Sequence, residues 1–307
     1  MLRAARHAAE LARFAAIRRS QEARDRQVLG ELEARPLELP AGLEIEWLGV
    51  AGYRLTFEGR TLLIDPYVSR IPLRRFLRRE PALPDRALVE RYVRPPGEVV
   101  GVAVGHTHFD HALDVPEVAR RFECPALGSR SLATLMRLHG LGDRAVDVEP
   151  SRPYELGPFT VTFVPSAHAR IVLGLSVPMA GEMRARRLEE LSARAYRCGQ
   201  VWGIRIEVAG LRIYHQGSAD LVDEALGHHP VDVFLAGVAG REFTPDYWRR
   251  ILPQLEPRTV VPCHYDDFFR PLDAPMGFIT NVSLARVPEE IAAESPDIEV
   301  VALPAPG

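Results

Sequence analysis

The strongest constraint in this sequence is a run of metal-binding side chains that directly follows a buried strand. Residues 99–104 (VVGVAV) are continuously apolar and largely β-branched, which predicts a strand that is buried on both faces. The run after Gly105 reads HTHFDH and offers four potential ligands, His106, His108, Asp110 and His111. Pro116 then marks the first turn of a predicted helix. The sequence therefore predicts a metal site on a loop that joins a strand to a helix.

The residue types in this run favour two adjacent divalent ions. Imidazole and carboxylate groups suit zinc, and also manganese or iron. In an extended turn, His106 and His108 can point the same way and hold one ion, while Asp110 and His111 begin the next segment and reach a second. A catalytic site also keeps a coordination position for water. A solvated or adventitious histidine-rich loop is the alternative, and the regular spacing after a buried strand disfavours it.

The HTHFDH run and its surroundings resemble the metallo-β-lactamase superfamily, whose signature is H-x-H-x-D-H. The resemblance extends from about Leu43 to about Leu272. It implies an α/β protein built as a four-layer αββα sandwich, which the spacing of the elements alone would not establish. It also implies two further ligands that follow strand ends, His168 for the first ion and His264 for the second.

A wider pattern narrows the resemblance within the superfamily. The motifs WLG, LIDPY and PCHYDDF look closest to the branch that contains ascorbate-phosphate lactonases and the phospholipase D that cleaves N-acyl phosphatidylethanolamines. In LIDPY, Asp65 is expected to support the ligands. The likeness implies a hydrolase in which a metal-activated water attacks an ester, a lactone or a phosphodiester. Asp110 would ligate the second ion and orient that water or accept its proton.

One position departs from the superfamily pattern, which places a bridging aspartate after a glycine at a strand end. Here residues 211–215 run into Gln-Gly-Ser-Ala-Asp, so that Ser218 stands where the bridging aspartate is expected. Either the loop bends and Asp220 serves as a metal ligand, or the bridge is missing and the second site is weaker or empty. Asp220 could instead cap the helix that follows it.

Three functions follow from these motifs. The first is the metal-dependent hydrolase of a small ester, lactone or phosphodiester. The second is a phospholipase D-like phosphodiesterase acting on lipid, for which the arginine-rich residues 70–80 could hold a phosphate and the apolar residues 171–180 an acyl chain. The third is a non-catalytic metal-binding protein, for which Ser218 is the only support.

Composition sets broader limits. With 307 residues and 47% hydrophobic content, the chain can bury one large core. We expect a helical extension and linker over residues 1–40 and a hydrolase domain over residues 41–307.

A net charge of −3 argues against a nucleic-acid partner. The substrate is expected to be a small molecule or a lipid, and the oligomeric state stays open. Three scattered cysteines suggest no disulfide framework.

The N-terminal residues 1–35 alternate alanine, leucine and arginine at helical spacing. They lack the apolar core of a secretory signal, and the sequence has no apolar stretch that could span a membrane. We therefore expect a cytoplasmic protein. The helix could pack on the domain, mediate self-association, or lie on a membrane surface with its arginines facing anionic lipid.

The remaining elements are predicted from hydrophobic periodicity. Strands are expected at residues 43–48, 53–57, 61–64, 99–104, 160–164, 201–208, 211–215, 231–236 and 259–262. Helices are expected at residues 116–122, 131–139, 184–195 and 245–252.

Overall fold

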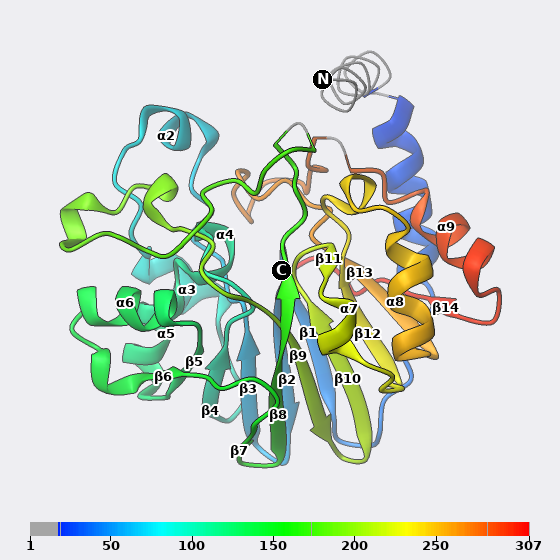
Figure 1. The fold of residues 1–307 in the computed structure, drawn as a ribbon, viewed down its shortest axis with the longest axis horizontal. Coiled ribbons are helices and arrows are strands. Elements are labelled where there is room, and N and C mark those ends of the chain that lie inside the picture. The colour runs from blue at the N-terminus through cyan, green and yellow to red at the C-terminus, as the bar shows by residue number, and fades with distance from the viewer. Residues whose placement is uncertain (1–17, 19, 173, 281, 307) are drawn as a thin grey trace.

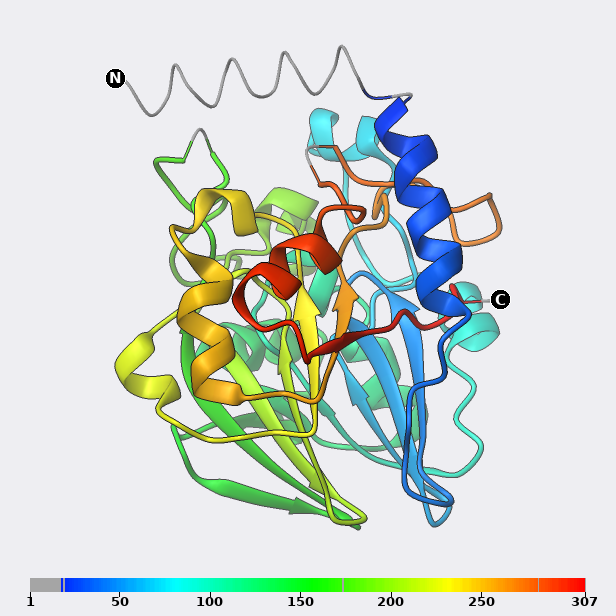
Figure 2. The ribbon, with the colours of Figure 1, turned by 90° about the vertical axis from the view of Figure 1, so that its right-hand side faces the viewer.

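Two β-sheets lie face to face at the centre of the molecule, with helices on both outer surfaces (Figure 1). The computed structural model describes residue 18 and residues 20–172, 174–280 and 282–306. Helices α3, α5 and α6 cover the outer face of the first sheet, and α7, α8 and α9 cover that of the second (Figures 1 and 2). The predicted four-layer αββα sandwich is therefore confirmed.

The first sheet has six strands in chain order. They are β1 (Glu44–Gly49), β2 (Gly52–Phe57), β3 (Arg60–Ile64), β4 (Glu98–Ala103), β5 (Ala126–Gly128) and β6 (Ala145–Asp147). Strands β1 to β3 are antiparallel, whereas β3 to β6 run parallel. Each connection between two parallel strands of this sheet contains at least one helix, because parallel strands are joined by a long crossover that is usually helical. The helices are α2 (Leu73–Arg78), α3 (Arg86–Tyr92), α4 (Phe109–Ala112), α5 (Val115–Phe122) and α6 (Arg130–Leu138).

The second sheet has eight strands. Its main order is β11 (Asp220–Leu221), β8 (Phe159–Ala167), β9 (Val201–Val208), β10 (Leu211–Gln216), β12 (Val233–Gly237), β13 (Thr259–Cys263) and β14 (Glu299–Val300), with β7 (Pro153–Leu156) paired to β8. Strands β10, β12, β13 and β14 are parallel. Their crossovers contain α7 (Asp223–Leu226), α8 (Tyr247–Leu255) and α9 (Val287–Glu294).

Two hydrophobic cores hold the layers together, and neighbouring residues of one strand serve both. Leu62 of β3 belongs to the core between the sheets, where it joins Phe163 and Leu235. Leu63, the next residue, belongs to the core between the first sheet and its helices, together with Val118 of α5. Successive side chains of a strand point to opposite faces, and here both faces are covered.

The strand predictions are confirmed, since each predicted strand coincides with an observed one. The largest difference is at β8, which continues three residues beyond the predicted end, so that His168 is the first residue after the strand. The helices predicted at residues 116–122, 131–139 and 245–252 correspond to α5, α6 and α8. The short strands β5, β6, β7, β11 and β14 were not expected, because two to four residues carry too little periodicity.

The helix predicted at residues 184–195 is wrong. This segment contains only two short 3-10 turns, Leu188–Glu190 and Ala193–Ala195. The carbonyl of Leu191 accepts a hydrogen bond from the Ala82 amide (2.7 Å), and Ser192 forms an isolated bridge with Pro81. Pairing with a distant segment therefore replaces the local helical hydrogen bonds, which shows tertiary context overriding helix propensity.

The N-terminal extension packs on the domain where it is described. Residues 20–33 are helical, and Leu29 and Leu32 are buried in the core cluster that includes the space between the sheets. The buried Asp25 accepts a hydrogen bond from the Ala285 amide (2.8 Å). The expectations for residues 1–17 lie outside the described residues, and the domain boundary near residue 40 stays a prediction. Among the described residues, no helix combines the length and apolar character needed to cross a membrane.

Candidate metal centre

Six of the predicted ligands converge at one edge of the sandwich. His106 follows β4, His168 follows β8 and His264 follows β13, while α4 contributes Asp110 and His111. In both sheets these are the carboxyl ends of strands, where α/β proteins place their sites. The potential ligand atoms form two groups, each with all members within 4.8 Å of one another: His106, His108 and His168, and Asp110, His111 and His264. The sequence-distant histidines therefore meet the HTHFDH run.

Hydrogen bonds to the second ring nitrogen orient three of these imidazoles. His108 Nε2 lies 2.9 Å from the carbonyl oxygen of Pro178, and His168 Nδ1 lies 2.8 Å from that of Ala169. His111 Nδ1 lies 2.8 Å from the Asp65 carboxylate. In each case the bonded nitrogen donates its proton, so that in the neutral ring the other nitrogen keeps a lone pair. This arrangement is typical of histidines that bind metal, and it supports the expected role of Asp65.

Asp65 is held between the strand ends by backbone contacts. It follows β3 with φ 41°, and its second carboxylate oxygen accepts a hydrogen bond from the Gly105 amide (2.7 Å). A Cβ atom at position 105 would lie 3.1 Å from this carboxylate. Glycine suits the position where the chain enters the HTHFDH run, because a side chain there would crowd the Asp65 carboxylate.

A second buried network fixes the loop that carries His264, which has φ 60°. The His264 amide donates to the carbonyl of Val50 (2.7 Å), and the Val50 amide donates to Asp266 (3.0 Å). The other oxygen of Asp266 forms a buried ion pair with Arg70 (2.8 Å). Arg70 therefore positions this loop, and the expectation that residues 70–80 could hold a phosphate stays a prediction for the other arginines of that segment.

The charges within the groups suit metal coordination. Burial and the neighbouring imidazoles lower the pKa of His106 well below its usual value. Burial lowers the pKa of His108 to about 4 and that of His168 to about 3. Burial acts to raise the pKa of Asp110, but the imidazoles of His111 and His264 hold it below the usual range. Near neutral pH the first group is therefore neutral and Asp110 is ionised, which are the forms that bind divalent ions.

The structure does not bring Asp220 into either group. Its carboxylate accepts a hydrogen bond from the Leu221 amide (2.9 Å) and lies 3.6 Å from the Arg250 guanidinium. The neighbouring helix α7 begins at Asp223, and Asp220 does not cap it. The groups among the described residues thus contain Asp110 as their one carboxylate and lack a second that could bridge them.

Residues 217 and 218 lie where such a bridge would stand. A Cβ atom at Gly217 would lie 2.9 Å from the ring of His111. The Ser218 hydroxyl accepts a hydrogen bond from the Ala169 amide (3.3 Å), next to His168, and Ser218 lines the same pocket as Asp110. This loop therefore lies beside both ligand groups.

We predict that Ser218→Asp strengthens binding of the second ion by at least about tenfold, because it adds a carboxylate beside both groups. Metal stoichiometry after dialysis against a competing chelator measures this. Ser218→Asn is the matched control, since it has nearly the same shape without the charge. Equal metal retention in the two variants would show that residue 218 does not reach the ions.

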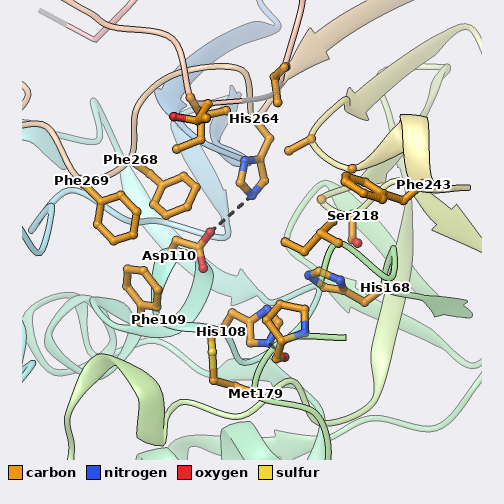
Figure 3. A pocket seen from close by; sticks show the side chains of 18 of the residues that line it. His108, Phe109, Asp110, His168, Met179, Ser218, Phe243, His264, Phe268 and Phe269 are labelled. Atoms are coloured by element: carbon orange, nitrogen blue, oxygen red, sulfur yellow. Dashed lines mark hydrogen bonds and ion pairs between the residues drawn. The ribbon is translucent and has the colours of Figure 1, made fainter. Parts of the chain in front are cut away.

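Two members of each group line a pocket of about 370 Å³, namely His108 and His168 of the first and Asp110 and His264 of the second (Figure 3). Aromatic side chains dominate one wall, where the rings of Phe76, Phe109 and Phe269 all contact one another, with centroids 5.5 to 5.9 Å apart. Phe268 packs on His264 with centroids 5.6 Å apart. Sequence reasoning missed this wall. The adjacent phenylalanines in PCHYDDFF were the available signal, because they follow a predicted ligand directly.

Fold and site together define the class of this protein as a metal-dependent hydrolase. A family model described as "Beta-lactamase superfamily domain" matches residues 44–264, which span β1 to the last predicted ligand. The chain therefore belongs to the metallo-β-lactamase superfamily.

Relatives in several bacteria support this class. The chain is 26% identical over 227 residues to a protein of Cereibacter sphaeroides named a UPF0173 metal-dependent hydrolase, covering 74% of this chain and 87% of the relative. It is 25% identical over 260 residues to a protein of the same name in Paracoccus denitrificans, covering 84% of this chain and 96% of the relative.

Solved structures share the fold. A possible metal-dependent hydrolase from Veillonella parvula superposes with a TM-score of 0.51 at 16% identity, covering 87% of this chain and 98% of that one. A diiron β-hydroxylase from Streptomyces venezuelae superposes with a TM-score of 0.54 at 14% identity, covering 87% of this chain and 53% of that one. One scaffold thus occurs in proteins with different chemistries, so the reaction must be argued from the site.

Proposed function

We propose that this protein hydrolyses a carboxylic ester or lactone that carries an apolar acyl or aryl group. The observation that supports this most directly is that members of both ligand groups line a pocket with mainly aromatic and aliphatic walls. None of the described residues that line the pocket is an arginine. It thus offers no guanidinium to bind phosphate oxygens, and an apolar ester suits it better than a highly charged substrate.

In this proposal the first ion is held by His106, His108 and His168, and the second by Asp110, His111 and His264, with zinc as the expected metal. When bound, such ions lower the pKa of a coordinated water and polarise the scissile oxygen. Each group supplies three protein ligands, which leaves room for water and substrate. The predicted cytoplasmic location stays part of the proposal.

The protein's own side chains then have separate tasks. Asp110 is ionised and lines the pocket, so it can orient the attacking water and accept its proton. Asp65 keeps the His111 ring in one tautomer and one orientation. The phenylalanine wall holds the apolar part of the substrate and keeps bulk water from the reacting carbonyl.

The test combines metal analysis with a panel of soluble substrates. We expect up to two ions per chain, turnover that a chelator abolishes, and kcat/KM rising by about fourfold for each acyl methylene that the pocket buries. Faster cleavage of bis(p-nitrophenyl) phosphate than of any ester would favour the lipid phosphodiesterase alternative. Full metal loading without turnover on any substrate class would favour the non-catalytic alternative.

A further inference from the structure

Exposed apolar side chains gather around the mouth of the pocket. Among the described residues, seven large apolar side chains are exposed, and five of them belong to two segments that contribute to the pocket wall. These five are called the apolar rim here: Leu73 and Leu77 on α2, and Ile171, Val172 and Leu175 on the loop after β8. Leu77 is 60% exposed and Leu175 is 56% exposed, so these side chains have no packing partner that covers them.

Each of the two rim segments also contributes one side chain to the pocket wall. Phe76 of α2 contributes to the aromatic wall, and Ile171 contributes from the loop. Leu73 lies about one helical turn from both Phe76 and Leu77, so the two leucines share one side of the helix next to the pocket wall. Figures 1 and 2 show α2 (cyan) and the loop after β8 (green) at the same end of the molecule.

The rim also carries local positive charge on a chain whose net charge is −3. Residues 74–80 contain four arginines and a single acidic residue, Glu80. Glu80 lies 3.5 Å from the Arg75 guanidinium and 3.8 Å from that of Arg78. Arg74 and Arg79 are exposed and form no ion pair with any described residue. Apolar side chains flanked by free guanidinium groups match an interface between hydrocarbon and anionic headgroups.

We propose that the apolar rim and the α2 arginines dock the protein on an anionic lipid surface, with the pocket mouth facing the membrane. This inference rests on the proposed function, because it makes an amphiphilic ester held in that surface the substrate that enters the pocket. The leucines insert among the acyl chains and the guanidinium groups meet the headgroups. A second copy of the chain suits the rim less well, since a two-fold contact would bring both sets of arginines together.

The test is co-sedimentation of the full chain with phosphatidylcholine vesicles, either pure or containing roughly a third phosphatidylglycerol. The rim variant is Arg74→Glu/Leu77→Glu. The control is Arg137→Glu/Val222→Glu, which makes the same changes at an exposed arginine and an exposed valine outside the rim. Each arginine near an anionic leaflet strengthens binding by about fivefold, so the rim variant should bind at least tenfold more weakly. The control should bind like wild type.

Hydrolysis of a soluble short-chain ester, measured without vesicles, separates this inference from the proposed function. The rim variant should keep that activity, because Arg74 and Leu77 do not line the pocket. The docking proposal is overturned if the wild-type protein does not bind anionic vesicles, or if the rim variant and the control lose vesicle binding to the same extent. It is also overturned if wild type is a dimer that the rim variant converts to a monomer while vesicle binding is absent.

Discussion

The His108→Ala protein should fold but lose metal-dependent hydrolysis, with kcat/KM reduced by roughly a thousandfold or more. His108 belongs to the first ligand group, and its Nδ1 lies 3.0 Å from Nε2 of His106. Removing the ring therefore takes away a ligand directly, whereas loss of an outer partner typically costs only about 10 to 100-fold. Metal analysis should show about one ion fewer per chain than in wild type.

The matched control is His228→Ala. His228 is exposed, and its ring contacts the carbonyl of Pro253 (3.3 Å) far along the chain from the ligand run. This variant should keep wild-type metal content and activity. Circular dichroism should give the same spectrum for both variants. Persistent activity in a well-folded His108→Ala protein would contradict the assignment of the first group.

Asp114→Ala should have the largest effect on stability, lowering the free energy of unfolding by about 3 kcal/mol. Its buried carboxylate accepts hydrogen bonds from the amides of Val68 (2.7 Å) and Ser69 (2.8 Å) and from the Ser69 hydroxyl. Alanine would leave all three donors buried without a partner. The sequence predicts a helix that begins near this position, with Pro116 in its first turn. Asp114 does precede α5, yet its side chain makes no capping bond and instead ties the helix to the segment after β3.

Urea unfolding of the metal-free protein measures this effect without the contribution of bound ions. Ser69→Ala is the control for the loss of a single donor and should cost about 1 kcal/mol. Similar losses in the two variants would show that the backbone amides find other acceptors.

The same carboxyl group gives stability a defined pH dependence. Burial raises the pKa of Asp114 from 3.8 to about 6 in the folded protein. Because the folded state favours the protonated form, the stabilisation from this group is complete below pH 3.8 and is lost as the pH rises through 6. Asp114→Asn cannot ionise at this position, so the difference in stability between wild type and this variant should change across that interval.

Local sequence patterns predicted most of the site because the ligands lie at strand ends. A buried strand can be identified from its own residues, and the polar residue that follows it must emerge at the edge of the sheet. This reasoning located the HTHFDH run, and the superfamily resemblance added His168 and His264. The structure brings all of them together within two compact groups.

Other features depended on partners that are distant in the sequence. Arg70 belongs to the arginine-rich segment that could hold a phosphate, but Asp266, nearly two hundred residues away, holds it in a buried ion pair. The apolar wall of the pocket likewise combines Phe76, Phe109 and Phe269 from separate segments. No local pattern specifies such contacts, because they arise only after the two sheets have packed.

The sequence by itself determined the strands and the residues able to bind metal, because hydrophobic periodicity and ligand chemistry are properties of short segments. The sandwich class came from the resemblance to the superfamily. Only the tertiary structure decided between Asp220 and Ser218. The Asp220 carboxylate pairs with the Arg250 guanidinium, whereas Ser218 lies on the pocket wall beside His168. The physical reason is that the direction of a loop side chain is set by the charges and hydrogen bonds of whatever packs against it.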